Sequence, residues 1–164
     1  MTKLPEILQA DSVEVLDTEE EFGAKRFETW KSAVEADENR AVSGIVRDGS
    51  GRIFLVKYES GLNGWRLPGS SVDRIGDFED RLRKALEEQL GVVPETVTPS
   101  LVQAHTAKHD GERATYYYVI CETELGDSPE SVLERDSIDE EVTFAWFDDR
   151  PEEVMNPTVI SNFF

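Results

Sequence analysis

The stretch that decides the fold runs from Trp65 to Val92 and reads WRLPGSSVDRIGDFEDRLRKALEEQLGV. Trp65–Leu67 is predicted to be a short strand, and the Pro-Gly-Ser-Ser that follows it a loop. From Asp77 to Leu90 an apolar residue returns at every fourth position among charged ones, as in a helix with one buried side. Gly91 then supplies the residue type that most readily ends a helix. The buried side is predicted to consist of Phe78, Leu82, Leu86 and Leu90.

Both flanks of this stretch alternate between apolar and polar residues, which is the period of a half-buried β-strand. Before it, residues 41–48 and 52–59 surround a Gly-Ser-Gly turn and predict a β-hairpin. After it, residues 97–107 and 113–125 predict a second strand pair, and Val142–Phe147 a last strand. Asp149–Glu152 has the Asp and Pro of a helix start and predicts a short C-terminal helix. Together these elements predict a mixed sheet with helices packed on its faces.

The N-terminal residues carry patterns of their own. Ser12–Asp17 alternates like a short strand. Thr18 and Glu21 have the spacing of a capping box, which predicts that a helix begins there. The helix would carry three apolar residues on one side, namely Phe27, Trp30 and Val34. We therefore assign residues 1–39 as an N-terminal extension and residues 40–164 as one domain that includes the C-terminal helix.

The chain is strongly acidic. Its 164 residues include 35 acidic and 17 basic side chains, for a formal net charge of -18. Self-repulsion at this level is costly in dilute buffer, but salt at about 1 M screens charges beyond roughly 3 Å. The charge balance therefore favours a halophilic source with a very saline cytoplasm over an ordinary acidic protein. Nucleic acid is not an expected partner, because the sequence has no basic cluster to displace counterions from phosphates.

Two further features bear on the compartment. Cys121 is the only cysteine, so the chain cannot form an internal disulfide. The first residues lack the basic start and long apolar run of a secretory signal. Charges also interrupt every apolar run before the roughly 20 residues that cross a bilayer. We therefore expect a cytoplasmic protein with no membrane segment.

The segment Leu67–Val92 resembles the Nudix box, whose consensus G-x5-E-x7-R-E-U-x-E-E-x-G-U usually follows Leu-Pro-Gly. The match has no gap, and the order of strands and helix around it is similar to the family over residues 40–154. The last strand also contains a Trp and precedes Asp-Asp-Arg-Pro-Glu-Glu, as is typical of the family. The resemblance implies a Nudix-type α/β/α sandwich with a mixed β-sheet. The matching positions are Leu67, Pro68, Gly69, Val72, Asp73, Phe78, Glu79, Asp80, Leu86, Glu88, Gly91 and Val92.

The activity of this family explains the spacing of its consensus. Nudix enzymes split a diphosphate linked to another moiety, and they use Mg²⁺ or Mn²⁺ to neutralise the phosphates and activate water. Glutamates at i, i+3 and i+4 lie on one helix face, which gives the oxygen-rich cluster that hard cations need. Backbone N–H groups of the preceding loop can approach phosphate. The resemblance therefore implies a nucleotide or other diphosphate-linked metabolite as the ligand.

This chain departs from the consensus at those acidic positions. The expected acids are replaced by Gly76, Ala85 and Gln89, and the glycine that opens the consensus is replaced by Ser70. Of the three helix carboxylates, only Glu88 remains. The resemblance implies that Glu88 is the catalytic residue and a metal ligand. A single carboxylate should bind a hydrated divalent cation weakly.

Other residues are candidates for the rest of the site. Glu140 and Glu141 precede the last strand, where related enzymes often place a further acid, and they are candidate metal ligands. Asp73, Asp77, Asp80 and Glu87 are possible substitutes, although in so acidic a chain the alternative of a solvated surface charge applies to them and to Glu88. Candidate substrate-binding residues, through a cationic side chain or loop backbone, are Arg66, Gly69, Ser70, Arg81 and Lys84.

The sequence leaves three functional hypotheses. The leading one is a Nudix-family protein that recognises a nucleotide or diphosphate-linked metabolite, with diphosphatase activity weak or lost. The second is an active hydrolase with metal ligands partly outside the box. The third is a non-catalytic interaction module. His105 and His109 lack a zinc-site signature, and we expect them to pack on the strands or the surface.

Overall fold

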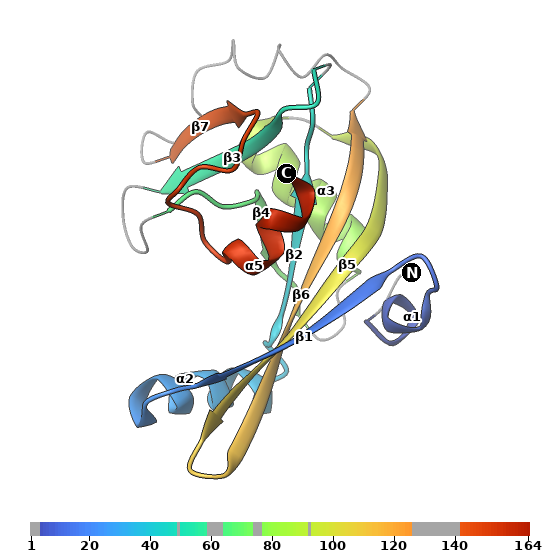
Figure 1. Ribbon diagram of the computed structural model, residues 1–164. Helices are drawn as coiled ribbons and strands as arrows, with labels where there is room; N and C mark the ends of the chain where they lie inside the picture. Colours follow the sequence, from blue (N-terminus) through green and yellow to red (C-terminus); the bar gives the residue numbers. More distant parts are fainter. Residues whose placement is uncertain (1–3, 49, 59–63, 74–76, 92, 126–141) are drawn as a thin grey trace. The chain divides into compact units, whose positions relative to one another are not determined.

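The computed structural model describes residues 4–48, 50–58, 64–73, 77–91, 93–125 and 142–164 (Figure 1). No helix among these residues is long and apolar enough to cross a membrane. The helices are α1 (Leu4–Gln9), α2 (Ala24–Glu35), α3 (Phe78–Leu90), α5 (Pro157–Ile160) and the 3-10 helix η1 (Ser161–Phe163). The strands are β1 (Glu14–Glu21), β2 (Arg40–Ile45), β3 (Ile53–Tyr58), β4 (Gly69–Ser71), β5 (Pro94–His109), β6 (Glu112–Leu125) and β7 (Val142–Phe147).

The strands form two sheets. A five-stranded sheet has the order β1-β5-β6-β2-β4, and β3 and β7 form a separate antiparallel pair. β1 lies parallel to β5, whereas β5 and β6 are consecutive strands of a long hairpin (Figure 1). Asp110 and Gly111 close that hairpin with φ values of 49° and 81°, as a two-residue turn between twisted strands requires. The predicted mixed sheet is therefore confirmed.

Helix α3 forms where the local sequence predicts it. The Asp77 Oδ1 atom accepts hydrogen bonds from the backbone N–H groups of Glu79 (3.0 Å) and Asp80 (3.1 Å), which satisfies the first turn. Gly91 follows the last turn with φ 70°, the left-handed conformation that ends helices. The predicted apolar side is buried, because Phe78, Leu82, Leu86 and Leu90 are all at most 4% exposed.

Two of the predicted helix starts were wrong. Thr18 and Glu21 are not a capping box, because the parallel pairing with β5 extends β1 to Glu21, and α2 begins only at Ala24. The C-terminal helix does not begin at Asp149–Glu152. Trp65 exchanges backbone hydrogen bonds of 2.7 Å with the residues around Val154 and holds them extended, so α5 begins at Pro157.

Two strand assignments also needed correction. The Pro-Gly-Ser-Ser predicted to be a loop contains β4, which lies beside β2 in the larger sheet. The predicted hairpin of residues 41–48 and 52–59 consists of β2 and β3, which belong to different sheets. The two strands pair only near the turn, where Phe54 N–H donates to the Val46 carbonyl at 2.9 Å. The Asp48 carboxylate closes this turn by accepting from the backbone N–H groups of Ser50 and Arg52, each at 2.9 Å.

The residues divide into two compact units. Unit 1 comprises Met1–Ser43, Ser70–Leu82 and Pro99–Cys121, and unit 2 comprises Gly44–Gly69, Arg83–Thr98 and Glu122–Phe164. In unit 1, α2 packs Phe27, with Trp30 and Val34 beside it, on Phe22, Ala107 and Ala114. The largest fully buried side chains of unit 2 are Ile45, Val46, Ile53, Phe54, Leu55, Val56 and Leu86.

Candidate functional site

The second half of α3, in unit 2, carries the one remaining carboxylate of the Nudix-like pattern. Glu88 is exposed, and so is Lys84 one turn before it. Within the described part of the chain neither side chain forms an ion pair, although their i, i+4 spacing would allow one. Glu88 is therefore a solvent-accessible carboxylate that forms no ion pair with any cation among the described residues.

Gln89 has a different environment from Glu88. Its Nε2 atom donates a hydrogen bond of 2.8 Å to the carbonyl oxygen of Gly69, which is the predicted phosphate-binding glycine. Its Oε1 atom is buried and has no hydrogen-bond partner among the residues that the structure describes. An ionised carboxylate cannot donate a hydrogen bond, so an ionised glutamate could not make this contact. At this position the side chain holds the loop backbone rather than presenting a negative charge.

Ala85, where the family consensus places another acid, is buried with 4% of its surface exposed. A carboxylate at such a site would lose most of its hydration, which disfavours its ionised form. The three positions that would hold a cation on a Nudix helix therefore carry a buried methyl group, an exposed carboxylate and an amide bonded to the loop. This donor set does not fit Mg²⁺ or Mn²⁺, which require several oxygen ligands from one site.

The remaining predicted metal ligands, Glu140 and Glu141, lie outside the described residues, as does Gly76. Within the described ranges, no group of three or more His, Cys, Asp and Glu side chains could hold a metal ion. We derive no catalytic step through a metal.

The predicted substrate-binding residues lie in both units, each of which is described by itself. In unit 2, Arg66 is partly buried, and its backbone exchanges two hydrogen bonds of 2.9 Å with Val56 of β3. In unit 1, Arg81 is exposed, and its Nε atom donates to the Ser71 carbonyl at 3.1 Å. The Ser70 hydroxyl donates to the same carbonyl at 3.2 Å. The guanidinium of Arg81 is thus attached to the end of β4, the strand that precedes α3.

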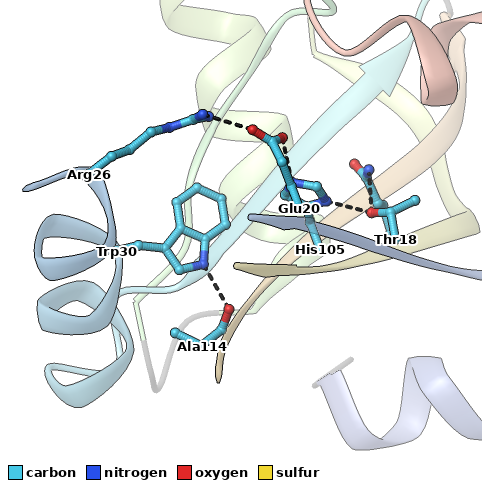
Figure 2. Close-up of polar contacts among 7 residues, drawn as sticks. Thr18, Glu20, Arg26, Trp30, His105 and Ala114 are labelled. Carbon is cyan, nitrogen blue, oxygen red and sulfur yellow. Dashed lines mark hydrogen bonds and ion pairs between the residues drawn. The ribbon is translucent and has the colours of Figure 1, made fainter. Parts of the chain in front are cut away.

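A polar cluster in unit 1 could not be predicted from the sequence (Figure 2). The hydroxyl of Thr18 contacts His105 Nδ1 at 2.6 Å and accepts a hydrogen bond from Gln103 Nε2 at 3.0 Å. The other ring nitrogen of His105 lies 3.4 Å from Glu20, which also pairs with Arg26 at 2.9 Å. The parallel register places Thr18 opposite His105. Local patterns give no sign of this pairing, since the two residues are separated by most of the chain.

The two histidines of β5 pack against neighbouring elements of the sheet, as expected. The side chain of His105 is 17% exposed and hydrogen-bonded to the neighbouring strand. His109 Nδ1 lies 3.0 Å from the Phe22 carbonyl oxygen, and its ring packs 5.8 Å from that of Phe27. Both rings therefore fasten β1 and α2 to β5.

Comparison with solved structures identifies the fold. The chain is similar to a MutT Nudix hydrolase from Burkholderia pseudomallei, with 23% identity, a TM-score of 0.58, and coverage of 75% of this chain and 94% of that one. The chain has the Nudix fold. A MutT protein from Bacillus halodurans has 16% identity and a TM-score of 0.55, and the match covers 76% of this chain and 78% of that one. A MutT structure from work on Aliivibrio salmonicida and Vibrio cholerae has 18% identity and a TM-score of 0.52, and the match covers 76% of this chain and 96% of that one.

The Nudix fold predicted from Leu67–Val92 is thus confirmed. No protein-family model and no curated protein matches the sequence. At these identities the structural likeness establishes the fold alone, so the activity depends on the residues of this chain. In this Nudix fold, α3 is the helix on which Ala85 and Gln89 replace two of the expected acids and Glu88 retains the third.

Proposed function

We propose that this chain is a Nudix-family protein that binds a nucleotide or another diphosphate-linked metabolite, with diphosphatase activity that is weak or lost. The observation that carries the proposal is the hydrogen bond from Gln89 Nε2 to the Gly69 carbonyl, at 2.8 Å. It gives a structural role to a side chain that would otherwise have to be a metal ligand. The buried Ala85 supports the same conclusion, because that position suits an apolar side chain.

Binding is proposed to persist because cationic and loop groups remain available to a phosphate. Lys84 and Arg81 are both exposed, and Arg81 is fixed to the end of β4 by its contact with Ser71. Planar guanidinium groups suit phosphate oxygens, and loop N–H groups around Gly69 and Ser70 add neutral donors. Arg66 is proposed to contribute in unit 2. We further propose that the protein functions in a cytoplasm of high salt, where its net charge of -18 is screened.

Binding and turnover are tested together in molar KCl. The ligands are nucleoside diphosphate sugars, ADP-ribose, dinucleoside polyphosphates and nucleoside triphosphates, each with Mg²⁺ and with Mn²⁺. We expect saturable binding with little or no metal-dependent turnover. Glu88→Gln is compared with Glu87→Gln, which removes another exposed charge from the adjacent position.

The outcomes distinguish the three hypotheses. Rapid turnover that Glu88→Gln abolishes and Glu87→Gln preserves would establish an active hydrolase with ligands outside the helix, for which Glu140 and Glu141 are the first candidates. A folded protein that binds none of these ligands would establish an interaction module. Saturable binding with weak turnover supports the proposal.

A further inference from the structure

In unit 2, a short piece of the C-terminal chain is paired with the segment that leads to α3. Trp65 N–H donates to the Glu153 carbonyl oxygen and Met155 N–H donates to the Trp65 carbonyl oxygen, both at 2.7 Å. These two bonds form a parallel β-bridge between Trp65 and Val154. We call residues 153–155 the clasp. Both distances lie at the short end of the normal range, so the clasp is closely bound to Trp65.

Side chains reinforce the backbone pairing of the clasp. The Trp65 ring packs edge to face on Phe147 of β7, with the ring centroids 4.9 Å apart. Lys57 Nζ lies 5.9 Å from the centre of the Trp65 ring, within the range of a cation–π contact. The same ammonium group is 3.5 Å from the Glu153 carboxylate. Lys57 therefore joins the indole to the first residue of the clasp.

Gly64 permits this close approach of the two chain segments. Its φ of 138° is a conformation that side chains other than glycine's rarely adopt. A Cβ atom added there would lie 3.3 Å from Met155 Cγ and 3.4 Å from the Glu153 carbonyl oxygen. A side chain at position 64 would therefore push the clasp away from Trp65.

The segment from Trp65 to Gly69 is fixed at each end and between its ends. Arg66 exchanges two backbone hydrogen bonds of 2.9 Å with Val56, and the Pro68 carbonyl accepts from Gly44 N–H at 2.9 Å. The Gly69 carbonyl accepts from the Gln89 side chain at 2.8 Å. Since so short a segment has little slack, a displacement of Trp65 is passed on to Arg66 and Gly69.

We propose that the clasp is a positioning element of the phosphate site: by holding Trp65, it sets Arg66 and Gly69 where they bind a phosphate. The inference rests on the proposed function, which includes these two residues among the phosphate-binding groups. The clasp is itself anchored, because Val159 and Ile160 of the following helix α5 are 1% and 3% exposed. Misplacing a single charge-assisted hydrogen bond to phosphate lowers affinity by about tenfold or more.

The test measures binding of inorganic pyrophosphate by calorimetry in molar KCl. Gly64→Ala should weaken binding by about tenfold or more, because the added methyl group displaces the clasp. Gly51→Ala is the matched control and should bind as the wild type does. Gly51 also has a positive φ, 85°, but among the described residues an added Cβ would meet no atom within 4 Å.

A rescue separates positioning from a general loss of stability. Met155→Ala removes the Cγ atom that the new methyl group would meet, so adding it to Gly64→Ala should restore part of the lost affinity. Thermal melting of each variant shows how much stability the positive φ alone removes. Equal losses of affinity in Gly51→Ala and Gly64→Ala would overturn the proposed role of the clasp.

Hydrogen exchange of the wild-type protein provides a second measurement, in case Gly64→Ala does not fold. If the clasp favours phosphate binding, then phosphate must favour the clasp to the same extent. Saturating pyrophosphate should therefore slow exchange of the Trp65 and Met155 amides, and it should leave the Gly51 amide, bonded to the Asp48 carbonyl at 3.1 Å, unchanged. Binding that leaves the first two amides unchanged overturns the positioning role and leaves the proposed function intact. Failure of the wild type to bind pyrophosphate overturns both proposals.

Discussion

Replacing Gln89 by Glu restores an acid that the Nudix consensus expects, and the structure predicts that the change destabilises the protein. Gln89 Nε2 donates to the Gly69 carbonyl oxygen at 2.8 Å. An ionised carboxylate has no hydrogen to donate, and it would set a negative charge against that oxygen. Gln89→Met is the matched control, because it loses the same hydrogen bond without adding charge.

The magnitude follows from these two effects. Loss of the hydrogen bond costs about 1–3 kcal/mol in both variants at neutral pH. The partly buried charge adds a further cost, so we expect Gln89→Glu to lose about 2–4 kcal/mol at neutral pH. The same repulsion should raise the folded-state pKa of the introduced carboxyl above its unfolded value of about 4.3. The extra loss of stability caused by the charge is then absent below the unfolded-state pKa, and this loss grows as the pH rises to the folded-state pKa.

Urea denaturation in molar KCl, at about pH 4 and at neutral pH, measures both effects. At the lower pH the protonated carboxyl can donate to the Gly69 carbonyl oxygen, so Gln89→Glu should be at least as stable as Gln89→Met, whereas at neutral pH it should be the less stable of the two. A Gln89→Glu protein as stable as the wild type at neutral pH would refute the structural role of the amide. Adding Mg²⁺ should stabilise Gln89→Glu more than Gln89→Met, since only the former adds a second carboxylate beside Glu88.

Three further predictions concern stability. Thermal stability should climb steeply as KCl rises toward molar concentration, because screening relieves the net charge of -18; a melting temperature independent of KCl would contradict the halophilic adaptation. Asp77→Ala should lower the free energy of unfolding in urea by about 0.5–2 kcal/mol, because it removes the side chain that caps α3. Asp77→Asn should retain most of that free energy, because the Asn side-chain oxygen can accept the same hydrogen bonds. Burial raises the pKa of Asp48, but the hydrogen bonds from Arg52 and Ser50 outweigh it, and the pKa is lowered overall. The contribution of Asp48 to stability should therefore be fully present above its unfolded pKa of about 3.9, and it should disappear as the pH falls through the folded-state pKa. Asp48→Asn should accordingly lower the melting temperature at neutral pH and have little effect in strong acid.

The elements predicted well from the sequence are those whose causes are local. The four-residue spacing of apolar side chains, the Asp77 cap and Gly91 all belong to α3 itself, and the helix follows them closely. Val142–Phe147 forms β7 with the predicted bounds. In both cases one short segment contains enough information to specify its own structure.

The errors arose where distant segments decide the structure. Thr18 to Glu21 resembles a helix start, but pairing with β5 makes it a strand. Likewise β2 and β3 resemble one hairpin, yet β3 pairs along its whole length with β7, almost a hundred residues later in the chain. Strand pairing of this kind depends on register with a remote partner, which local periodicity does not encode.

The candidate site shows the same limit in its chemistry. Alignment with the Nudix consensus identifies the missing acids, but it reads Gln89 only as a lost ligand. The structure makes Gln89 a donor to Gly69 and makes Ala85 a buried residue. Restoring both acids would therefore remove a loop contact and bury a charge, each at a cost in stability that metal binding would have to offset. We therefore expect that metal-dependent hydrolysis through these two positions would require compensating changes around the helix as well as the two acids, because Ala85 and Gln89 contribute to the fold itself.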